Sequence, residues 1–169
     1  MLKLLAIAAA LADPVQQPRP CLTQAEAEAV TLVALPEIIR QTGATCAAAL
    51  PATSLLRRAH SPMLQRYDAE AARAWPAARG AVIKLSPSAE ALLGSDLARP
   101  LLTSLIAPLI AGRVATKDCG TIDRLVTALE PLPPRNTASV IVTAVAHAQA
   151  QRTRTTPRAA ELPLCPAER

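Results

Sequence analysis

Four cysteines are the residues of this chain whose chemistry is easiest to assign: Cys21, Cys46, Cys119 and Cys165. Zinc sites usually draw on closely spaced pairs such as C-x-x-C. Here no two cysteines lie within twenty residues of each other. An even number of cysteines in an exported chain indicates disulfides. We therefore predict two disulfides among these residues and no metal site.

The pairing of the cysteines is constrained by the helix expected between the first two. If residues 23–50 form mostly one helix, Cys21 and Cys46 lie about 35 Å apart at 1.5 Å per residue. A disulfide needs Cα atoms within about 7 Å. Each of these two cysteines should then pair with either Cys119 or Cys165. A break at Pro36 into a helical hairpin would restore the pairing of Cys21 with Cys46.

The two histidines, His60 and His147, could act as metal ligands or as an acid and base. Neither has a second histidine three or four residues away, and nothing in the sequence places the two together. Helices that bind metals normally carry their ligands in such pairs. We expect both at the surface or at helix ends. If His147 is buried in the apolar last helix, it needs a hydrogen-bond partner or must be neutral.

No other motif predicts catalysis. The closest carboxylate pairs, Glu26 with Glu28 and Asp68 with Glu70, are two residues apart and so face differently on a helix. The sequence has no G-x-S-x-G serine motif and no glycine-rich phosphate loop. We predict no catalytic, metal or cofactor-binding residue. Scattered basic residues and near-absent aromatic residues also argue against nucleic-acid binding.

The first twelve residues have the order of a secretory signal. Lys3 is followed by the apolar run Leu4 to Leu11, and small residues end at Ala12. The run is short for such a signal and far shorter than the roughly 20 apolar residues of a membrane span. We predict cleavage after Ala12, a periplasmic or secreted mature protein, and no transmembrane segment after cleavage.

Composition predicts an all-α fold. The chain has one Trp, one Tyr, no Phe and sixteen prolines, and it is rich in Ala, Leu and Arg. Strands favour aromatic and β-branched residues, whereas helices favour Ala, Leu and Arg. We predict one compact bundle of five to seven helices, several kinked by proline and stapled by two disulfides. Residues 13–150 should form the helical domain, and residues 151–169 an Arg/Pro-rich tail tied back through Cys165.

Local signals mark the first predicted helices. Thr23 and Glu26 form a capping box, and a face at 3-4 spacing follows. Ser61-Pro62 is a helix start, with Gly80 as a C-cap, and Ser86-Pro87 is another start. The first face is Leu22, Ala25, Ala29, Leu32, Pro36, Ile39, Gly43, Cys46 and Leu50. We also expect a short helix over 53–60. The helix that starts at Ser61-Pro62 should bury a face with Leu64, Tyr67 and Ala71 and carry an ion-pair cluster of Arg66, Glu70 and Arg73. A connector over 81–85 and a helix from 86 to about 93 or 97 should follow.

The second half is expected to supply the centre of the bundle. Leu101 to Val114 is the most apolar segment and predicts a buried core helix. Asp118 should cap the next helix, with the face Cys119, Ile122, Val126 and Leu129. The last helix, from 134 or 137 to about 149, is apolar nearly all round, so we expect it to be central.

No convergent polar group is visible, so we predict a non-enzymatic exported protein with a structural or partner-binding role. The expected partner is an envelope protein. The alternative is a helical carrier of an apolar small molecule or lipid, which the leucines and isoleucines of residues 101–110 favour. A deep apolar cavity near Leu105, Leu109 and Val142 would support the carrier. A cleft joining His60 or His147 to a carboxylate would instead indicate an enzyme.

Overall fold

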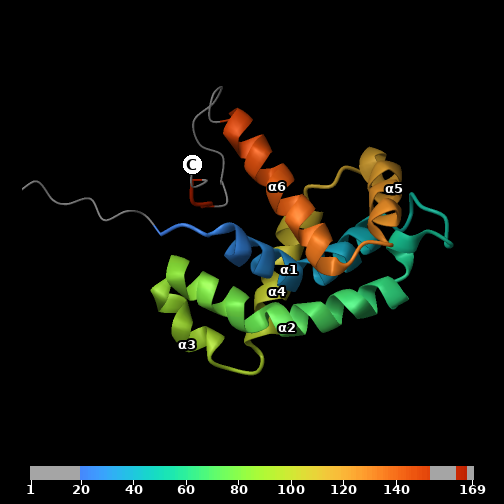
Figure 1. Cartoon of the computed structure of the whole chain (residues 1–169). Coiled ribbons are helices and arrows are strands. Elements are labelled where there is room, and N and C mark those ends of the chain that lie inside the picture. Colours follow the sequence, from blue (N-terminus) through green and yellow to red (C-terminus); the bar gives the residue numbers. More distant parts are fainter. Residues whose placement is uncertain (1–19, 153–162, 167–169) are drawn as a thin grey trace, which may run out of the picture.

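A computed structural model describes residues 20–152 and 163–166, and the regular structure of these ranges is helical (Figure 1). The predicted all-α bundle with two disulfides is confirmed. The predicted signal, residues 1–12, lies outside the described residues. The elements are α1 (Gln24–Thr45), the 3₁₀ turn η1 (Leu55–Arg57), α2 (Pro62–Leu85), η2 (Pro87–Ala89), α3 (Glu90–Leu93), α4 (Ala98–Ala111), η3 (Thr116–Asp118), α5 (Cys119–Leu129) and α6 (Pro134–Arg152).

Helix α1 begins at the predicted capping box. The backbone N–H of Glu26 donates to Thr23 Oγ1 at 3.3 Å, and the N–H of Thr23 donates to Glu26 Oε2 at 2.8 Å. Two of the unpaired donors at this helix end are thereby satisfied. Lys84 of α2 also donates to the Glu26 carboxylate. This bond, followed by that from the Thr23 backbone, lowers the pKa of Glu26.

Helix α1 continues through Pro36 and ends at the cap residue Cys46. The hairpin that would have brought Cys21 to Cys46 is therefore absent. A proline inside a helix removes one backbone hydrogen bond, and here Pro36 is buried among the apolar residues of α1. Most of the predicted face is buried, but Ala25 is exposed in the first turn and Leu50 lies beyond the helix end.

Helix α1 is the centre of the bundle, because it packs against α2, α4 and α6 (Figure 1). Every residue from 32 to 36 is buried. The prediction that the last helix is central is wrong. Helix α6 buries Thr137, Ala138 and Val142, whereas its Val140 is 52% exposed. Helix α6 therefore contacts the bundle along one side and exposes apolar residues on another.

Helix α2 starts as predicted, with Ser61 Oγ accepting from the N–H of Leu64 at 3.3 Å and Pro62 in the first turn. It then runs through Pro76 and Gly80 to Leu85, so the predicted C-cap at Gly80 and the connector over 81–85 are wrong. The buried row of Ala74, Ala78 and Ala81 explains this continuation. Its 3-4 spacing extends the packed face of α2 beyond Gly80.

Two predicted helices are shorter in the structure, and one predicted helix cap makes no bond. Residues 53–60 contain only the turn η1, and residues 86–97 contain η2 and the four-residue α3. Asp118 occupies the N-cap position of α5, but its side chain makes no capping bond. Its backbone is already helical, with φ −91° and ψ −9°, because η3 leads directly into α5. A capping side chain normally needs an extended backbone.

The disulfides join Cys21 to Cys165 and Cys46 to Cys119, with Cα–Cα distances of 4.9 and 5.6 Å. Each early cysteine therefore pairs with a late one, as the predicted helix length requires. Beside the first bridge, the N–H of Leu22 donates to the carbonyl of Pro163 at 2.6 Å, and that of Cys165 to the carbonyl of Leu22 at 2.8 Å. The C-terminal segment is thus held against the start of α1.

Candidate functional site

The structure does not assemble a site around the two histidines. His60 is exposed just before α2, and its carbonyl accepts from Gln65. His147 is exposed in the second half of α6, where its Nε2 lies 3.4 Å from the side-chain nitrogen of Gln151. Within residues 20–152 and 163–166, no group of three or more His, Cys, Asp or Glu side chains is arranged to hold a metal ion.

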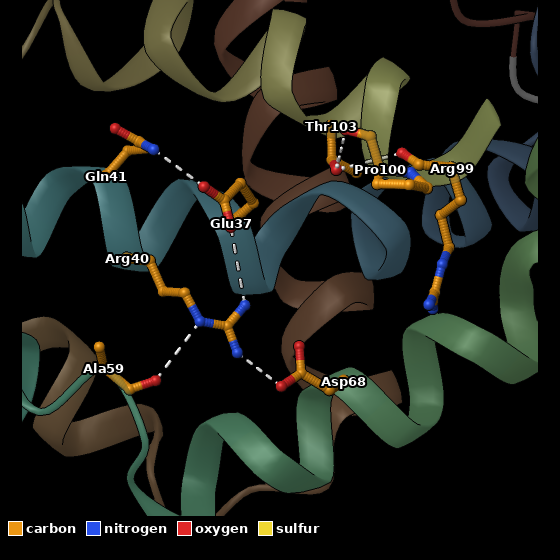
Figure 2. A network of polar contacts seen from close by, with 8 residues as sticks. All are labelled: Glu37, Arg40, Gln41, Ala59, Asp68, Arg99, Pro100 and Thr103. Carbon is orange, nitrogen blue, oxygen red and sulfur yellow. Dashed lines mark hydrogen bonds and ion pairs between the residues drawn. The ribbon is translucent and has the colours of Figure 1, made fainter. Parts of the chain in front are cut away.

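A polar pocket of about 180 Å³ lies between α1, α2 and α4 (Figure 2). Arg40 of α1 organises it: Nη2 contacts Asp68 Oδ2 of α2 at 2.5 Å, and Nε donates to the carbonyl of Ala59 at 3.4 Å. Arg40 Nη1 also lies 3.7 Å from Glu37 Oε2. Arg99 of α4 directs its guanidinium toward α2 from the other side (Figure 2).

The polar side chains of this pocket are engaged with one another and with backbone carbonyls. Both of its carboxylates are engaged by Arg40, and the amide nitrogen of Gln41 also donates to Glu37 at 2.9 Å. The hydroxyl of Thr103 donates to carbonyls of its own helix, at Arg99 and Pro100. The arrangement ties α1 to α2 and to the segment before α2.

A second polar cluster surrounds the buried carboxylate of Glu70, which is 7% exposed. Arg73 Nη1 donates to Glu70 Oε2 at 2.8 Å, and Arg135 Nε of α6 donates to Oε1 at 2.5 Å. The hydrogen bond from Arg73 lowers the pKa of Glu70, opposed by desolvation and supported by Arg135. The predicted partner Arg66 instead donates to the carbonyl of Glu130 at 2.6 Å. Arg135 was not predicted, because no local signal links residues 65 positions apart.

Replacing Glu70 by Gln should lower the free energy of unfolding by about 1 kcal/mol at neutral pH, since both arginines are largely exposed and screened. The folded-state pKa of Glu70 lies below 4.5. Its contribution is therefore complete above that pH and is lost as the pH falls through the lower folded-state pKa. Urea denaturation at a series of pH values should show the unfolding free energies of the wild type and of Glu70→Gln converging as the pH falls. Glu90→Gln, a change at an exposed site, is the control. A difference between the wild type and Glu70→Gln that stays constant in acid would contradict a stabilising role for the Glu70 carboxylate.

The most apolar helix, α4, is not buried as predicted. Three leucines of α4 and the leucine just before it are more than half exposed: Leu97 (66%), Leu101 (57%), Leu105 (70%) and Leu109 (68%). We call these four residues the leucine face. Helix α4 packs on α1 and buries its alanines, Ala98, Ala107 and Ala111. The partly buried Leu102, Thr103 and Ile106 also line a small pocket with residues of α1, so the packed side of α4 includes them as well as alanines, and the leucine face remains outside.

The leucine face is continuous and almost without charge. Its members are four residues apart, so they form a single ridge along α4, and Ile110, next to Leu109 in the sequence, is 44% exposed. Helix α4 contains no acidic residue and one basic residue, Arg99. Exposed charges flank it at both ends, with Asp96 before the helix and Arg113 after it.

A separate apolar pocket of about 160 Å³ lies where α5 faces α1, α2 and α6. Its lining includes Ile39, Met63, Ile122, Val126 and Ile141. The cavity near Leu105, Leu109 and Val142 that would have supported a carrier is not formed by these residues. The two leucines are exposed on α4, and Val142 packs with Leu22 and Ala81.

Comparison with protein-family models, with curated proteins and with solved structures found no match for this chain. Of the helices that the structure describes, none is both long enough and apolar enough to cross a membrane. The two disulfides are consistent with an oxidising compartment.

Proposed function

We propose that this protein is a non-catalytic, exported binding protein whose working surface is the leucine face, and that it binds a second copy of itself there. The observation that carries the proposal is the exposed ridge of Leu97, Leu101, Leu105 and Leu109. Contiguous exposed apolar patches of more than a few hundred Å² are rare on monomeric proteins and mark interaction sites. A ridge of this kind fits between the ridges of another helix.

A second copy is the occupant that the flanking charges favour. In an antiparallel pair of α4 helices centred on Leu105, Leu101 of one copy lies opposite Leu109 of the other. The same register places Arg113 of each copy opposite Leu97 of its partner, one position from Asp96, and both charged residues are exposed. Opposite charges therefore meet at both ends of an uncharged apolar contact. Such self-complementarity is what a two-fold symmetric interface requires.

The expected affinity is moderate. Covering eight leucines that are about two-thirds exposed contributes roughly 8–16 kcal/mol. Association opposes this by about 4–15 kcal/mol through lost translational and rotational freedom and side-chain ordering. With leucine burial near the upper end of its range and an association cost of about 8–10 kcal/mol, the difference of about 6–8 kcal/mol corresponds to a reversible dimer with a Kd of roughly 1–100 µM.

Sedimentation velocity across a concentration series tests the proposal. We expect Leu105→Glu to weaken the dimer about 100-fold or more, because two carboxylates would face each other in an apolar contact. Leu125→Glu is the matched control, since Leu125 is also an exposed leucine (58%) but lies on α5. It should leave dimerisation unchanged. A wild-type protein that stays monomeric at millimolar concentration, or equal weakening by both substitutions, would refute the proposal.

The proposed location, the periplasm or the exterior, is supported by two observations. Both disulfides need an oxidising environment to persist. Residues 1–12 also have the charged, apolar and small-residue order of a secretory signal. Intact-mass analysis of protein from the native host should show a chain that starts at Asp13 with four cysteines protected from alkylation. Retention of Met1 together with free thiols would contradict export.

A further inference from the structure

We infer that the apolar pocket beneath α5 is a binding site for a small hydrocarbon group of roughly six to eight carbons. The inference is independent of the leucine face, which lies on another helix. The pocket has a volume of about 160 Å³, and its lining comes from α1, η1, α2, α5 and α6. An engineered apolar cavity of about 150 Å³ stays dry and binds benzene, so a space of this size is sufficient for such a group.

The chemistry of the lining selects an apolar ligand. Aliphatic side chains predominate, among them Leu35, Ile39, Met63 and Ile141. The hydroxyl of Tyr67, a buried residue, donates to Thr137 Oγ1 at 2.8 Å. The phenol is thereby satisfied within the protein and does not require a polar ligand. No acidic or basic side chain contributes to the lining of this pocket.

Helix α5 covers the pocket while being fastened near both of its ends. The disulfide joins its first residue, Cys119, to Cys46, and in its second turn Asp123 accepts from the hydroxyl of Ser54 and from the N–H of Leu56. After its last residue, the carbonyl of Glu130 accepts from Arg66. Between these attachments, Ile122 and Val126 face the pocket. Figure 1 shows α5 at one end of the molecule, beside the segment that carries η1.

The pocket can be reached without unfolding. It is partly open to solvent, because Ile38, Ile122, Val126 and Ile141 of its lining are only partly buried. A ligand can therefore reach the apolar lining while the disulfide and the Asp123 contacts persist. The site thus combines a defined position with access, which a fully packed core does not offer.

Octan-1-ol is a suitable probe, because its chain matches the volume and it carries no charge. Isothermal titration calorimetry of the full chain should show saturable binding with one site. Val126→Trp, which fills the pocket, should weaken this binding about tenfold or more. Leu125→Trp adds the same ring on the exposed side of the same helix and should leave binding unchanged.

Two further measurements test the site without relying on the Trp variants. Methyl NMR of the wild-type protein should show contacts between octan-1-ol and both Met63 and Ile141, whatever the stability of the Trp variants. Leu105→Glu should bind octan-1-ol as the wild type does, so that failure of the proposed dimer and failure of this site are distinguishable. Three results would overturn the inference. They are a failure of octan-1-ol binding to saturate, retained binding by Val126→Trp, and loss of binding in Leu105→Glu.

Discussion

Replacing Cys46 and Cys119 together by alanine should lower the free energy of unfolding by about 4 kcal/mol. The bridge closes a loop of 73 residues, and on the chain-entropy model its removal returns that freedom to the unfolded chain. Both cysteines are buried, at 0% and 1% exposure, so their loss also removes packing in the core that surrounds Tyr67. Guanidinium denaturation monitored by far-UV circular dichroism measures the change.

The loss should be concentrated in α5, because the bridge joins the first residue of this helix directly to the cap residue at the end of α1. Hydrogen exchange should show faster exchange in residues 119–129 than in α1 or α2. The bridge between Cys21 and Cys165 should remain intact in this variant, which a mass measurement can verify as the control. A change in unfolding free energy below about 1 kcal/mol would show that the bridge is not a structural staple.

Replacing Gly43 by alanine should lower the free energy of unfolding by about 2–4 kcal/mol. A Cβ atom at this position would lie 2.1 Å from the carbonyl oxygen of Leu56, which is backbone and cannot rotate aside. Helix α1 and the turn η1 would therefore have to separate. Because Leu56 belongs to the buried core, the separation would open contacts around it. Thermal and urea denaturation should both report the loss.

Gly80→Ala is the matched control with the opposite sign. Gly80 lies within α2, is exposed, and would place its Cβ in open space. Alanine is favoured over glycine inside a helix by roughly 0.5–1 kcal/mol, so this variant should be more stable than the wild type. Equal effects at the two positions would show that the close contact of α1 with η1 does not exist in solution.

Short-range signals predicted the parts of the fold that depend on neighbouring residues. The capping box of Thr23 and Glu26, the start at Ser61-Pro62 and the early-to-late pairing of cysteines follow from rules that act within a few residues or along one helix. Gly80 misled the prediction for the same reason. Its local tendency to end a helix is outweighed by the packing of Ala81, which only the folded bundle contains.

The orientation of α4 could not be predicted from its composition. The helix is apolar on most sides, so its pattern does not distinguish the face that packs from the face that remains exposed. The contact with α1 decides this, because it engages Leu102 and Ile106 and leaves Leu101, Leu105 and Leu109 exposed. The pairing of Glu70 with Arg135 and the apolar pocket under α5 also depend on residues far apart in sequence, and single-sequence periodicity carries no information on such contacts.

The proposed self-association through α4 is tested most directly by a cysteine at its centre. In an antiparallel pair centred on residue 105, the two copies of this residue meet on the two-fold axis, within the roughly 7 Å between Cα atoms that a disulfide allows. Mild oxidation of Leu105→Cys should therefore yield a covalent dimer, whereas Leu125→Cys should stay monomeric, as read by intact mass without reduction. A Leu105→Cys protein that remains monomeric, or crosslinks no more than Leu125→Cys, would contradict the account.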